Sequence, residues 1–508
     1  MMPALSVAPG RPLADLLSGL AAVAPGEDRV IGHLTLDSRE VVPGTLFAAV
    51  SGTSRHGLEF VGEVLRRGAA AIVWEPDPQY DPSVAQRACA AAGVPLLTVP
   101  ALSMELSRIA GRFYGEPSRQ LSLIGVTGTD GKTSVSQFLA QALSIDRPCG
   151  VIGTLGYGLL GSLAEPTHTT PDAVTVQRLL KDMRDLGASH VAMEVSSHAL
   201  AQGRVAGLAF KVAVLTNLTR DHLDYHGTEE AYAAAKAALF RLPGLECAVL
   251  NRDDAFGRRL QAGLSPSVRV FDYTLDPQAQ DAAVVCQDLR YLPDGLAMRV
   301  RTPAGEAALT VPLLGRFNAA NALAALSTLL ALGMPLADAV ERLQELQPVA
   351  GRMQRLGGGS LPSVIVDYAH TPAALAAALD AVRQHTGGRV WCVFGCGGDR
   401  DRGKRPQMAA VADRKADEIV ITDDNPRTED PARIVDDILA GIKGRKPFLV
   451  HDRAAAIRLA IERAAPGDAV LIAGKGHETY QIVGSQRLAF DDCAVARAAL
   501  QERARWDL

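Results

Sequence analysis

The chain has 508 residues, more than one hydrophobic core usually organises, so we expect two to four domains. Hydrophobic residues make up 48% of the chain and charged residues 21%, which excludes a disordered or fibrous protein. The 52 Lys and Arg residues nearly balance the 56 Asp and Glu residues, so the overall charge gives no reason to expect binding to nucleic acid or to an anionic membrane.

The seven cysteines are odd in number and widely spaced, which favours reduced thiols in the cytoplasm over a disulfide framework. The N-terminal segment carries Arg11 and Asp15 inside its apolar stretch and lacks the basic-then-apolar order of a secretory signal. The apolar stretch Leu323 to Leu332 is too short to cross a bilayer. We therefore expect a cytoplasmic protein with no membrane segment.

In chain order, residues 1–101 form the first expected domain, and 101–118 has the apolar spacing of a connecting helix. From about residue 120 a unit recurs: a short apolar run, a turn rich in Gly, Asp, Asn or Pro, and an alanine-rich helical stretch. This alternation predicts an α/β fold with parallel sheets flanked by helices. Pro348 and Gly351 interrupt the pattern, so we expect three domains, with the boundaries 1–101, 102–346 and 347–508.

Seven short apolar runs are the predicted strands, and most are followed directly by polar or charged residues. They are Leu121–Val126, His190–Val195, Val212–Leu215, Val364–Val366, Val390–Phe394, Glu418–Ile421 and Ala469–Ile472. In open α/β sheets ligands bind beyond the carboxyl ends of the strands, so this placement indicates binding sites.

The segment Gly125 to Thr133 reads GVTGTDGKT and stands between a predicted strand and a predicted helix, the context that a phosphate-binding loop requires. Glycines let the backbone N–H groups turn towards phosphate oxygens, Lys132 supplies charge, and Thr133 offers a hydroxyl to Mg²⁺. The spacing is shorter than the common GxxxxGK[ST] pattern. An ordinary strand-to-helix turn is the competing interpretation, and the context disfavours it.

Glu194 ends one predicted strand, and Asp221 and His222 follow another, so both places could supply hard ligands for a phosphate-bound metal. Each residue alone could equally be a capping carboxylate or a satisfied histidine. Their combination with the phosphate loop favours phosphoryl transfer. No Ser-His-Asp set, CxxC pair or HExxH helix accompanies them.

Sequence blocks along nearly the whole chain resemble the Mur ligase family, in the order in which that family has them. They are Thr35–Arg39, Gly44–Phe47, the TGTDGKT loop, His168–Pro171, Glu194–His198 with Arg204, Asn217–Gly227, Tyr232–Lys236, Gly315–Asn321, Gly351–Met353, Asp367–Pro372, Gly395–Arg400, Asp424–Arg427 and Gly474–Glu478. Two positions depart from the common pattern: Asp130 stands where many relatives have Asn, and Gln354 where Glu is common.

The resemblance implies an N-terminal domain for the uridine end of a substrate, a central P-loop ATPase domain, and a Rossmann-like C-terminal domain for an incoming amino acid. It implies ATP and Mg²⁺ as cofactors and catalytic roles for Lys132, Glu194, His222 and Lys236. The implied ATP contacts are Gly128, Thr129, Gly131, Lys132, Thr133, Ser134, Asn318, Arg352, Asp367 and His370, and the implied metal ligands are Thr133, Glu194, His222 and Lys236. The implied substrate contacts are Ser38, Thr169, Thr170, Ser197, Arg204, Arg400, Asp424, Asn425, Arg427, Gly474 and Glu478.

Lys236 lies in an alanine-rich helical stretch, where a solvated lysine is the ordinary interpretation. The resemblance instead implies that CO₂ carboxylates Lys236. That modification would turn a cation into an anion able to support a second Mg²⁺.

The resemblance also implies a reaction in peptidoglycan precursor synthesis, and through it a role in cell shape and division. ATP would phosphorylate the carboxylate of UDP-N-acetylmuramoyl-L-alanyl-D-glutamate, and an amine, that of meso-diaminopimelate, would attack the acyl phosphate. Arg427 suits the distal carboxylate of this amino acid and Glu478 its distal ammonium. We expect a monomer.

Three alternatives stay open at this point. The added residue could be L-lysine or L-ornithine. Within the same fold, the nearest competitor is a folylpolyglutamate synthetase or a ligase acting on a neighbouring step, and the segments Asp424–Arg427 and Thr35–Arg39 disfavour both. A P-loop kinase or regulatory ATPase is the alternative from another class.

Overall fold

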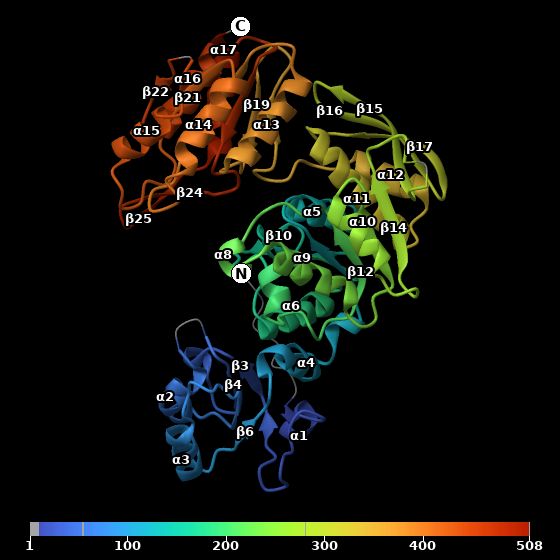
Figure 1. The fold of residues 1–508 in the computed structure, drawn as a ribbon, viewed down its shortest axis with the longest axis vertical. Helices are drawn as coiled ribbons and strands as arrows, with labels where there is room; N and C mark the ends of the chain where they lie inside the picture. The colour runs from blue at the N-terminus through green and yellow to red at the C-terminus, as the bar shows by residue number, and fades with distance from the viewer. Residues whose placement is uncertain (1–9, 53–54, 280, 445, 507–508) are drawn as a thin grey trace. The chain divides into compact units, whose positions relative to one another are not determined.

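The computed structural model describes residues 10–52, 55–279, 281–444 and 446–506 (Figure 1). The chain forms two compact units. The first comprises the residues up to Asp272 together with Ser327–Leu332, and the second comprises Tyr273–Leu326 and the residues from Gly333 onward. The three domain boundaries expected from the sequence stay a prediction.

The first unit contains a two-stranded sheet, a four-stranded sheet and seven strands of an eleven-stranded central sheet, with the helices that connect them. Its elements are β1 (Arg11–Pro12), α1 (Leu13–Leu16), β2 (Val30–Ile31), β3 (His33–Thr35), η1 (Ser38–Glu40), β4 (Thr45–Ala49), η2 (Gly57–Phe60), α2 (Val61–Arg66), β5 (Ala71–Trp74), α3 (Ser83–Ala92), β6 (Leu96–Thr98), α4 (Leu102–Tyr114), η3 (Pro117–Arg119), β7 (Ser122–Thr127), α5 (Lys132–Leu143), β8 (Cys149–Gly153), β9 (Gly156–Leu159), β10 (Ser162–Ala164), α6 (Ala173–Asp185), β11 (His190–Glu194), α7 (Ser197–Ala201), β12 (Phe210–Leu215), α8 (Leu223–His226), α9 (Glu229–Ala237), η4 (Ala238–Arg241), β13 (Cys247–Asn251) and α10 (Ala255–Ala262).

The N-terminal sheet has the order β3-β4-β5-β6, and all of its strand pairs are parallel. The helix α4 contributes Leu102, Leu106 and Ile109 to a hydrophobic core that also contains Leu34 and Leu46 of this sheet. Because these side chains share one core, α4 is packed as part of the N-terminal fold rather than as a bare connection.

The central sheet places β7 between β11 and β12, and both pairs are parallel. The register sets Glu194 opposite Val126 and Leu215 opposite Thr127, so the three strands end at one edge. Leu123 and Val126 are fully buried, as expected for a strand covered on both faces. The residues after these strands therefore gather at the start of α5.

The second unit begins within β14 (Arg269–Thr274) and continues with an antiparallel meander, two helices and a C-terminal sheet with its helices. Its elements are β15 (Val284–Leu292), β16 (Gly295–Thr302), β17 (Gly305–Val311), α11 (Arg316–Ala331, whose last residues belong to the first unit), α12 (Leu336–Gln344), β18 (Gln354–Gly357), β19 (Ser363–Asp367), α13 (Pro372–His385), β20 (Val390–Phe394), α14 (Lys404–Lys415), β21 (Glu418–Ile421), α15 (Pro431–Leu439), β22 (Phe448–Leu449), α16 (Arg453–Arg463), β23 (Ala469–Ala473), β24 (Tyr480–Val483), β25 (Gln486–Ala489) and α17 (Asp492–Trp506).

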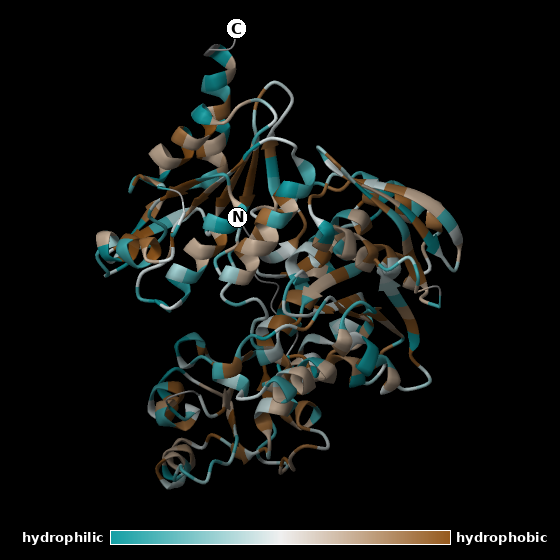
Figure 2. Ribbon diagram, turned by 45° about the horizontal axis from the view of Figure 1, so that its top comes forward, coloured by the Kyte–Doolittle hydropathy of each residue, from teal (hydrophilic) through white to brown (hydrophobic). Residues whose placement is uncertain are grey.

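The C-terminal sheet has the order β18-β19-β23-β20-β21-β22, and only β18 runs antiparallel to its neighbour. Separate hydrophobic cores cover its two faces, one with Leu375 and Leu379 of α13 and one with Ile457 and Ile461 of α16. Figure 2 shows brown hydrophobic segments along its strands. The carboxyl ends of β19, β21 and β23 lie at one edge of this sheet.

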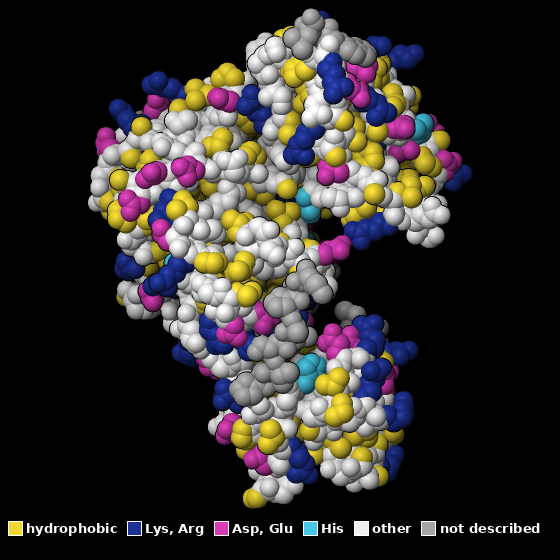
Figure 3. Space-filling model, turned by 180° about the vertical axis from the view of Figure 1, so that it is seen from behind, with side chains coloured by type: hydrophobic (Ala, Val, Ile, Leu, Met, Phe, Trp, Pro, Cys, Tyr) yellow, Lys and Arg dark blue, Asp and Glu magenta, His cyan; other side chains and the backbone are white. Residues whose placement is uncertain are grey.

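All seven predicted strands are found, within a residue or two at their ends, and the α/β class with parallel sheets is confirmed. Among the described residues no helix is long and apolar enough to cross a membrane. On the face drawn in Figure 3, basic and acidic side chains are interspersed, in line with the balanced composition.

A fully buried ion pair ties α16 to α17. Arg453 donates from Nε and Nη2 to the two carboxylate oxygens of Asp492, at 2.7 and 2.8 Å, and from Nη2 to the Ala473 carbonyl at the end of β23 at 3.0 Å. Both side chains are 0% exposed. Removing one partner would leave the other charge buried and uncompensated.

We expect Arg453→Met to lower the free energy of unfolding of the C-terminal fold by about 3–5 kcal/mol. The double variant Arg453→Met/Asp492→Leu should recover much of this loss, because no buried charge remains. Urea midpoints of the full chain measure both effects. Lys415→Met, which breaks a surface pair with Asp380, is the control and should cost only about 0–1 kcal/mol. A single variant as stable as the control would contradict this expectation.

Candidate functional site

The phosphate loop joins β7 to α5 at the carboxyl edge of the central sheet. Gly131 precedes the helix with φ 82°, and Gly128 has φ 147°. A Cβ atom at Gly128 would lie 1.8 Å from the Thr216 hydroxyl oxygen. Glycine is therefore required at Gly128, and the start of α5 offers N–H groups and a positive dipole end to an anion.

Thr216 and Asn217, the first residues after β12, hold the loop in this shape. The Thr129 and Asp130 N–H groups donate to the carbonyl and the side-chain oxygen of Asn217, both at 3.0 Å. The Thr216 hydroxyl donates to the Asp130 carbonyl at 2.6 Å. Neither Thr216 nor Asn217 was among the predicted site residues, although both directly follow a predicted strand.

Lys132 and the two residues after it open α5. The Lys132 ammonium donates to the Gly128 and Thr129 carbonyls, each at 2.9 Å. Thr133 and Ser134 are 6% and 7% exposed. The cation therefore lies against the predicted phosphate loop.

Glu194, at the end of β11, is the buried carboxylate next to this helix. Its two oxygens accept bonds from the Thr133 hydroxyl at 3.0 Å and from the Thr154 backbone N–H at 2.8 Å. A Cβ atom at Gly153 would lie 2.2 Å from Glu194 Oε1, so Gly153 keeps room for the carboxylate. The structure thus brings together two of the predicted metal ligands, Thr133 and Glu194.

Among the described residues no three His, Cys, Asp or Glu side chains form a group that could hold a metal ion alone. Mg²⁺ needs few protein ligands, because water and phosphate oxygens supply the others. The hydroxyl and carboxylate of Thr133 and Glu194 fit that requirement.

Thr169 and Thr170 precede α6 and lie beside the same carboxylate. The Thr169 hydroxyl is 3.2 Å from the Thr154 hydroxyl. The Thr170 hydroxyl donates to the Glu194 carbonyl at 2.7 Å, and Arg204 Nη1 donates to the Thr170 carbonyl at 2.7 Å. Three predicted substrate contacts, Thr169, Thr170 and Arg204, are therefore linked to Glu194 through short contacts.

His222 directly precedes α8 and lies in the left-handed region, with φ 52°. Its backbone N–H donates to the Asp221 carboxylate at 2.8 Å, and both side chains are nearly half exposed. Its ring lies 4.9 Å from that of His198, and the hydroxyl of Ser197, another predicted substrate contact, is 3.0 Å from His226 Nε2. Within the described residues no contact joins His222 to Glu194, so His222 as a metal ligand stays a prediction.

Lys236, in the last turn of α9, is 1% exposed. Its ammonium donates to the Gly128 carbonyl at 2.7 Å and lies 4.6 Å from the Tyr232 ring centroid. Burial first, and then the charge of Lys132, lower the pKa of Lys236 to about 6. The side chain is thus buried at the phosphate loop, and the ordinary interpretation of a solvated lysine is wrong.

The two C-terminal segments predicted to bind the amino acid meet in the second unit. Asn425 Nδ2 donates to Glu478 Oε2 at 3.0 Å, and a Cβ atom at Gly474 would lie 2.6 Å from Asp424 Oδ2. Arg427 has φ 54° and donates from Nη1 to the Gly398 carbonyl at 2.8 Å. The predicted residues of these two segments therefore lie together, and beside them is a residue that was not among the predicted contacts, Lys475, between two glycines.

Asp367 ends β19 and is partly buried. It accepts bonds from the Met353 and Ala369 backbone N–H groups at 2.8 and 2.9 Å, and burial raises its pKa. Arg352 lies 4.8 Å over the Tyr368 ring, and His370 Nδ1 is 2.8 Å from the Tyr368 carbonyl. Arg352, Asp367 and His370 are therefore neighbours, as expected for one binding surface, and their role stays a prediction.

Three predicted residues lie apart from these clusters. The Ser38 hydroxyl, in η1, donates to Glu63 at 3.4 Å. The Asn318 side chain, in the first turn of α11, is buried and bonds within its own helix end. Arg400 is exposed and donates to the Asp399 carbonyl at 3.2 Å. These contacts do not indicate a ligand for any of the three side chains, so their roles stay predictions.

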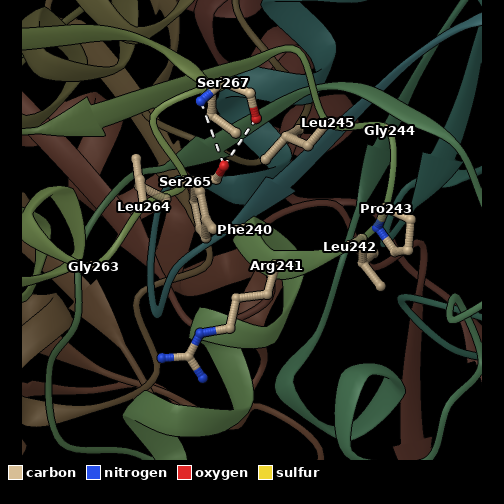
Figure 4. Close-up of a pocket in the computed structure, with 11 residues that line it drawn as sticks. Phe240, Arg241, Leu242, Pro243, Gly244, Leu245, Gly263, Leu264, Ser265 and Ser267 are labelled. Carbon is tan, nitrogen blue, oxygen red and sulfur yellow. Dashed lines mark hydrogen bonds between the residues drawn. The ribbon is translucent and has the colours of Figure 1, made fainter.

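An open pocket of about 500 Å³ lies elsewhere in the first unit, lined by Phe240–Leu245, Gly263–Ser265, Ser267 and Val268 (Figure 4). The hydroxyls of Ser265 and Ser267 bond to each other on its rim at 2.8 Å, as Figure 4 shows. The pocket includes none of the predicted site residues. We place the site at the phosphate loop, because the groups suited to bind phosphate, Lys132 and the N–H groups at the start of α5, lie there.

Three family models match the chain: "Mur ligase family, catalytic domain" over residues 30–114, "Mur ligase middle domain" over 126–329, and "Mur ligase, glutamate ligase domain" over 351–476. The chain is 53% identical to the UDP-N-acetylmuramoyl-L-alanyl-D-glutamate–2,6-diaminopimelate ligase of Alkalilimnicola ehrlichii, over 96% of this chain and 99% of that protein. It is 52% identical to the ligase of the same name from Pseudomonas aeruginosa, over 95% of this chain and 96% of that one.

A solved structure of a ligase with this name is also similar: the match covers 94% of this chain and 96% of the chain in that structure, with 36% sequence identity and a TM-score of 0.71. The family models, the identities and the structural match agree along the chain. The protein belongs to the Mur ligase family.

Proposed function

We infer that the protein is an ATP-dependent ligase that joins 2,6-diaminopimelate to UDP-N-acetylmuramoyl-L-alanyl-D-glutamate in peptidoglycan precursor synthesis. The relatives that match almost the whole chain carry this activity in their names. The contact between Thr133 at the phosphate loop and the buried Glu194, at 3.0 Å, is the structural observation that supports it most directly. We propose further that the protein works as a monomer in the cytoplasm.

In this function the γ-phosphoryl group of ATP passes to the free carboxylate of the UDP-linked substrate. The amine of diaminopimelate then attacks the acyl phosphate, an amide bond forms, and phosphate leaves. Lys132 neutralises phosphate charge, and Thr170 and Arg204 orient the substrate next to Glu194. Thr133 and Glu194 would hold Mg²⁺, which would supply further shielding of the phosphate charge.

We propose that Lys236 is carboxylated in the working enzyme. CO₂ adds to an amine only when the nitrogen is uncharged, and the addition releases one proton. The lowered pKa of Lys236 leaves much of the side chain neutral near pH 7, whereas an ordinary lysine would be charged. The resulting carboxylate would lie among the cationic groups of the phosphate loop.

A phosphate-release assay tests the function directly. We expect release only when the UDP-linked dipeptide and diaminopimelate are both present, and little release when L-lysine or L-ornithine replaces diaminopimelate. Release with ATP alone would favour a kinase or regulatory ATPase, and equal release with lysine would contradict the proposed specificity.

Carboxylation of Lys236 predicts activity that depends on CO₂ and pH. Because protonation below about pH 6 blocks the addition, the modified fraction should fall as the pH is lowered towards that value. Activity should drop in CO₂-free buffer and return with bicarbonate. Lys236→Ala should be inactive and partly restored by short carboxylic acids. Intact mass measures the modification.

Lys181→Ala is a matched control for this test, because Lys181 is also buried but is paired with Asp185 at 2.8 Å. Its activity should show the same dependence on CO₂ as the unaltered protein. Full activity of Lys236→Ala without added acids would rule the modification out as a requirement.

Arg427→Ala should lower kcat/KM for diaminopimelate by roughly 10- to 100-fold, because charge-assisted bonds to the distal carboxylate are lost. The KM for ATP should stay unchanged. Steady-state kinetics measure both constants, and Arg433→Ala, an exposed arginine on α15, serves as the control. A larger change in the KM for ATP than for diaminopimelate would count against this role.

A further inference from the structure

Lys475 is a fully buried lysine in the turn that follows β23. Gly474 and Gly476 flank it with φ values of 116° and 54°. A Cβ atom would lie 2.6 Å from the Asp424 carboxylate at Gly474 and 2.7 Å from the Tyr368 side chain at Gly476. The turn is therefore packed closely on both sides of the lysine, and its backbone path is fixed.

The ammonium group of Lys475 closes a ring of hydrogen bonds with Asn425 and Glu478. It donates to Asn425 Oδ1 and to Glu478 Oε2, both at 3.0 Å. Asn425 Nδ2 donates to the same Glu478 oxygen at 3.0 Å, and Asn425 Oδ1 also accepts from the Ile482 N–H at 3.0 Å. Each of the three side chains contacts the other two.

This ring fixes the orientation of the Asn425 amide. An ammonium group can only donate, so the atom of Asn425 facing Lys475 must be the oxygen. The amide nitrogen must then face Glu478, whose Oε2 receives two donors. Among the described residues no protein group donates to Glu478 Oε1, which leaves that oxygen as the one able to accept a bond from a ligand.

Lys475 also balances the charge of the two segments 424–427 and 474–478. They carry the carboxylates of Asp424 and Glu478 and the cations of Arg427 and Lys475. Burial lowers the pKa of His477 to about 4, so its imidazole is neutral. The distal end of diaminopimelate, one ammonium and one carboxylate, is itself balanced, whereas the distal end of L-lysine is a bare cation.

We propose that Lys475 is a positioning residue that sets the amino-acid specificity of this site. It orients Asn425 and Glu478, and it offsets one carboxylate so that a zwitterionic side chain is favoured over a cationic one. The proposal rests on the proposed function.

The test is Lys475→Met, assayed for kcat and KM with diaminopimelate, L-lysine and ATP. The KM for diaminopimelate should rise by roughly 10- to 100-fold, because two bonds to a charged group are lost. The KM for ATP should stay the same. The ratio of kcat/KM for diaminopimelate to kcat/KM for L-lysine should decrease. Kinetics equal to those of the unaltered protein would overturn the proposal.

A double variant keeps the test decisive if Lys475→Met folds poorly. In Lys475→Met/Glu478→Gln the partly buried Glu478 carboxylate is no longer left without its cation, so the urea midpoint should recover, while the KM for diaminopimelate should stay above that of Glu478→Gln alone. A KM equal to that of Glu478→Gln alone would show a merely structural role and overturn the proposal.

Two comparisons distinguish a failure of the role proposed for Lys475 from a failure of the proposed function. Lys181→Met removes a buried lysine that is paired with Asp185 in the first unit, and its diaminopimelate kinetics should not change. If the unaltered protein fails to turn over diaminopimelate, the proposed function fails. If it succeeds and Lys475→Met behaves identically, only the role of Lys475 fails.

Discussion

The Gly128 carbonyl oxygen accepts hydrogen bonds from two ammonium groups, those of Lys132 at 2.9 Å and Lys236 at 2.7 Å. Two cations beside this one oxygen would repel each other, and this repulsion adds to burial in lowering the pKa of Lys236 to about 6. The loop is held in this shape by hydrogen bonds of Thr129 and Asp130 to Thr216 and Asn217. The arrangement is therefore one that an anion stabilises, whether the anion is a phosphate or a modified Lys236.

The neighbouring strand end supplies the opposite charge. Glu194 is held by the Thr154 N–H and by the Thr133 hydroxyl, so its carboxylate has a fixed position at the first turn of α5. Cationic and anionic groups thus stand on either side of the place where the helix begins. Charges that are fixed before a ligand arrives need no rearrangement during reaction, which is how a site of this kind lowers a barrier to phosphoryl transfer.

The sequence was informative where function depends on neighbours along the chain. The phosphate loop could be predicted because its glycines, Lys132 and Thr133 lie within one strand-turn-helix unit. Lys236 could not be understood in this way, because its burial comes from the packing of α9 against a loop more than a hundred residues earlier. Lys475 was missed for the same reason: it meets Asn425 only because β23, late in the chain, inserts between β19 and β20. The packing of α4 into the N-terminal core was hidden too, since an apolar helical spacing does not say which sheet the helix will cover.

The backbone conformation of Arg427 also bears on which amino acid the site selects. The residue has φ 54°, a conformation that costs a non-glycine residue about 1 kcal/mol or more. It is held there by its N–H bond to the Ile482 carbonyl at 3.0 Å, by the Gly484 N–H bond to its own carbonyl at 2.7 Å, and by its side-chain bond to Gly398. An arginine on a relaxed backbone could follow many different carboxylates. An arginine that is fixed at three points can bind a carboxylate only at a set distance from the ring formed by Lys475, Asn425 and Glu478. The site then has an anion-binding group, Arg427, and a cation-binding group, Glu478, at a fixed separation. Such a fixed separation distinguishes a zwitterionic side chain from a simple amine.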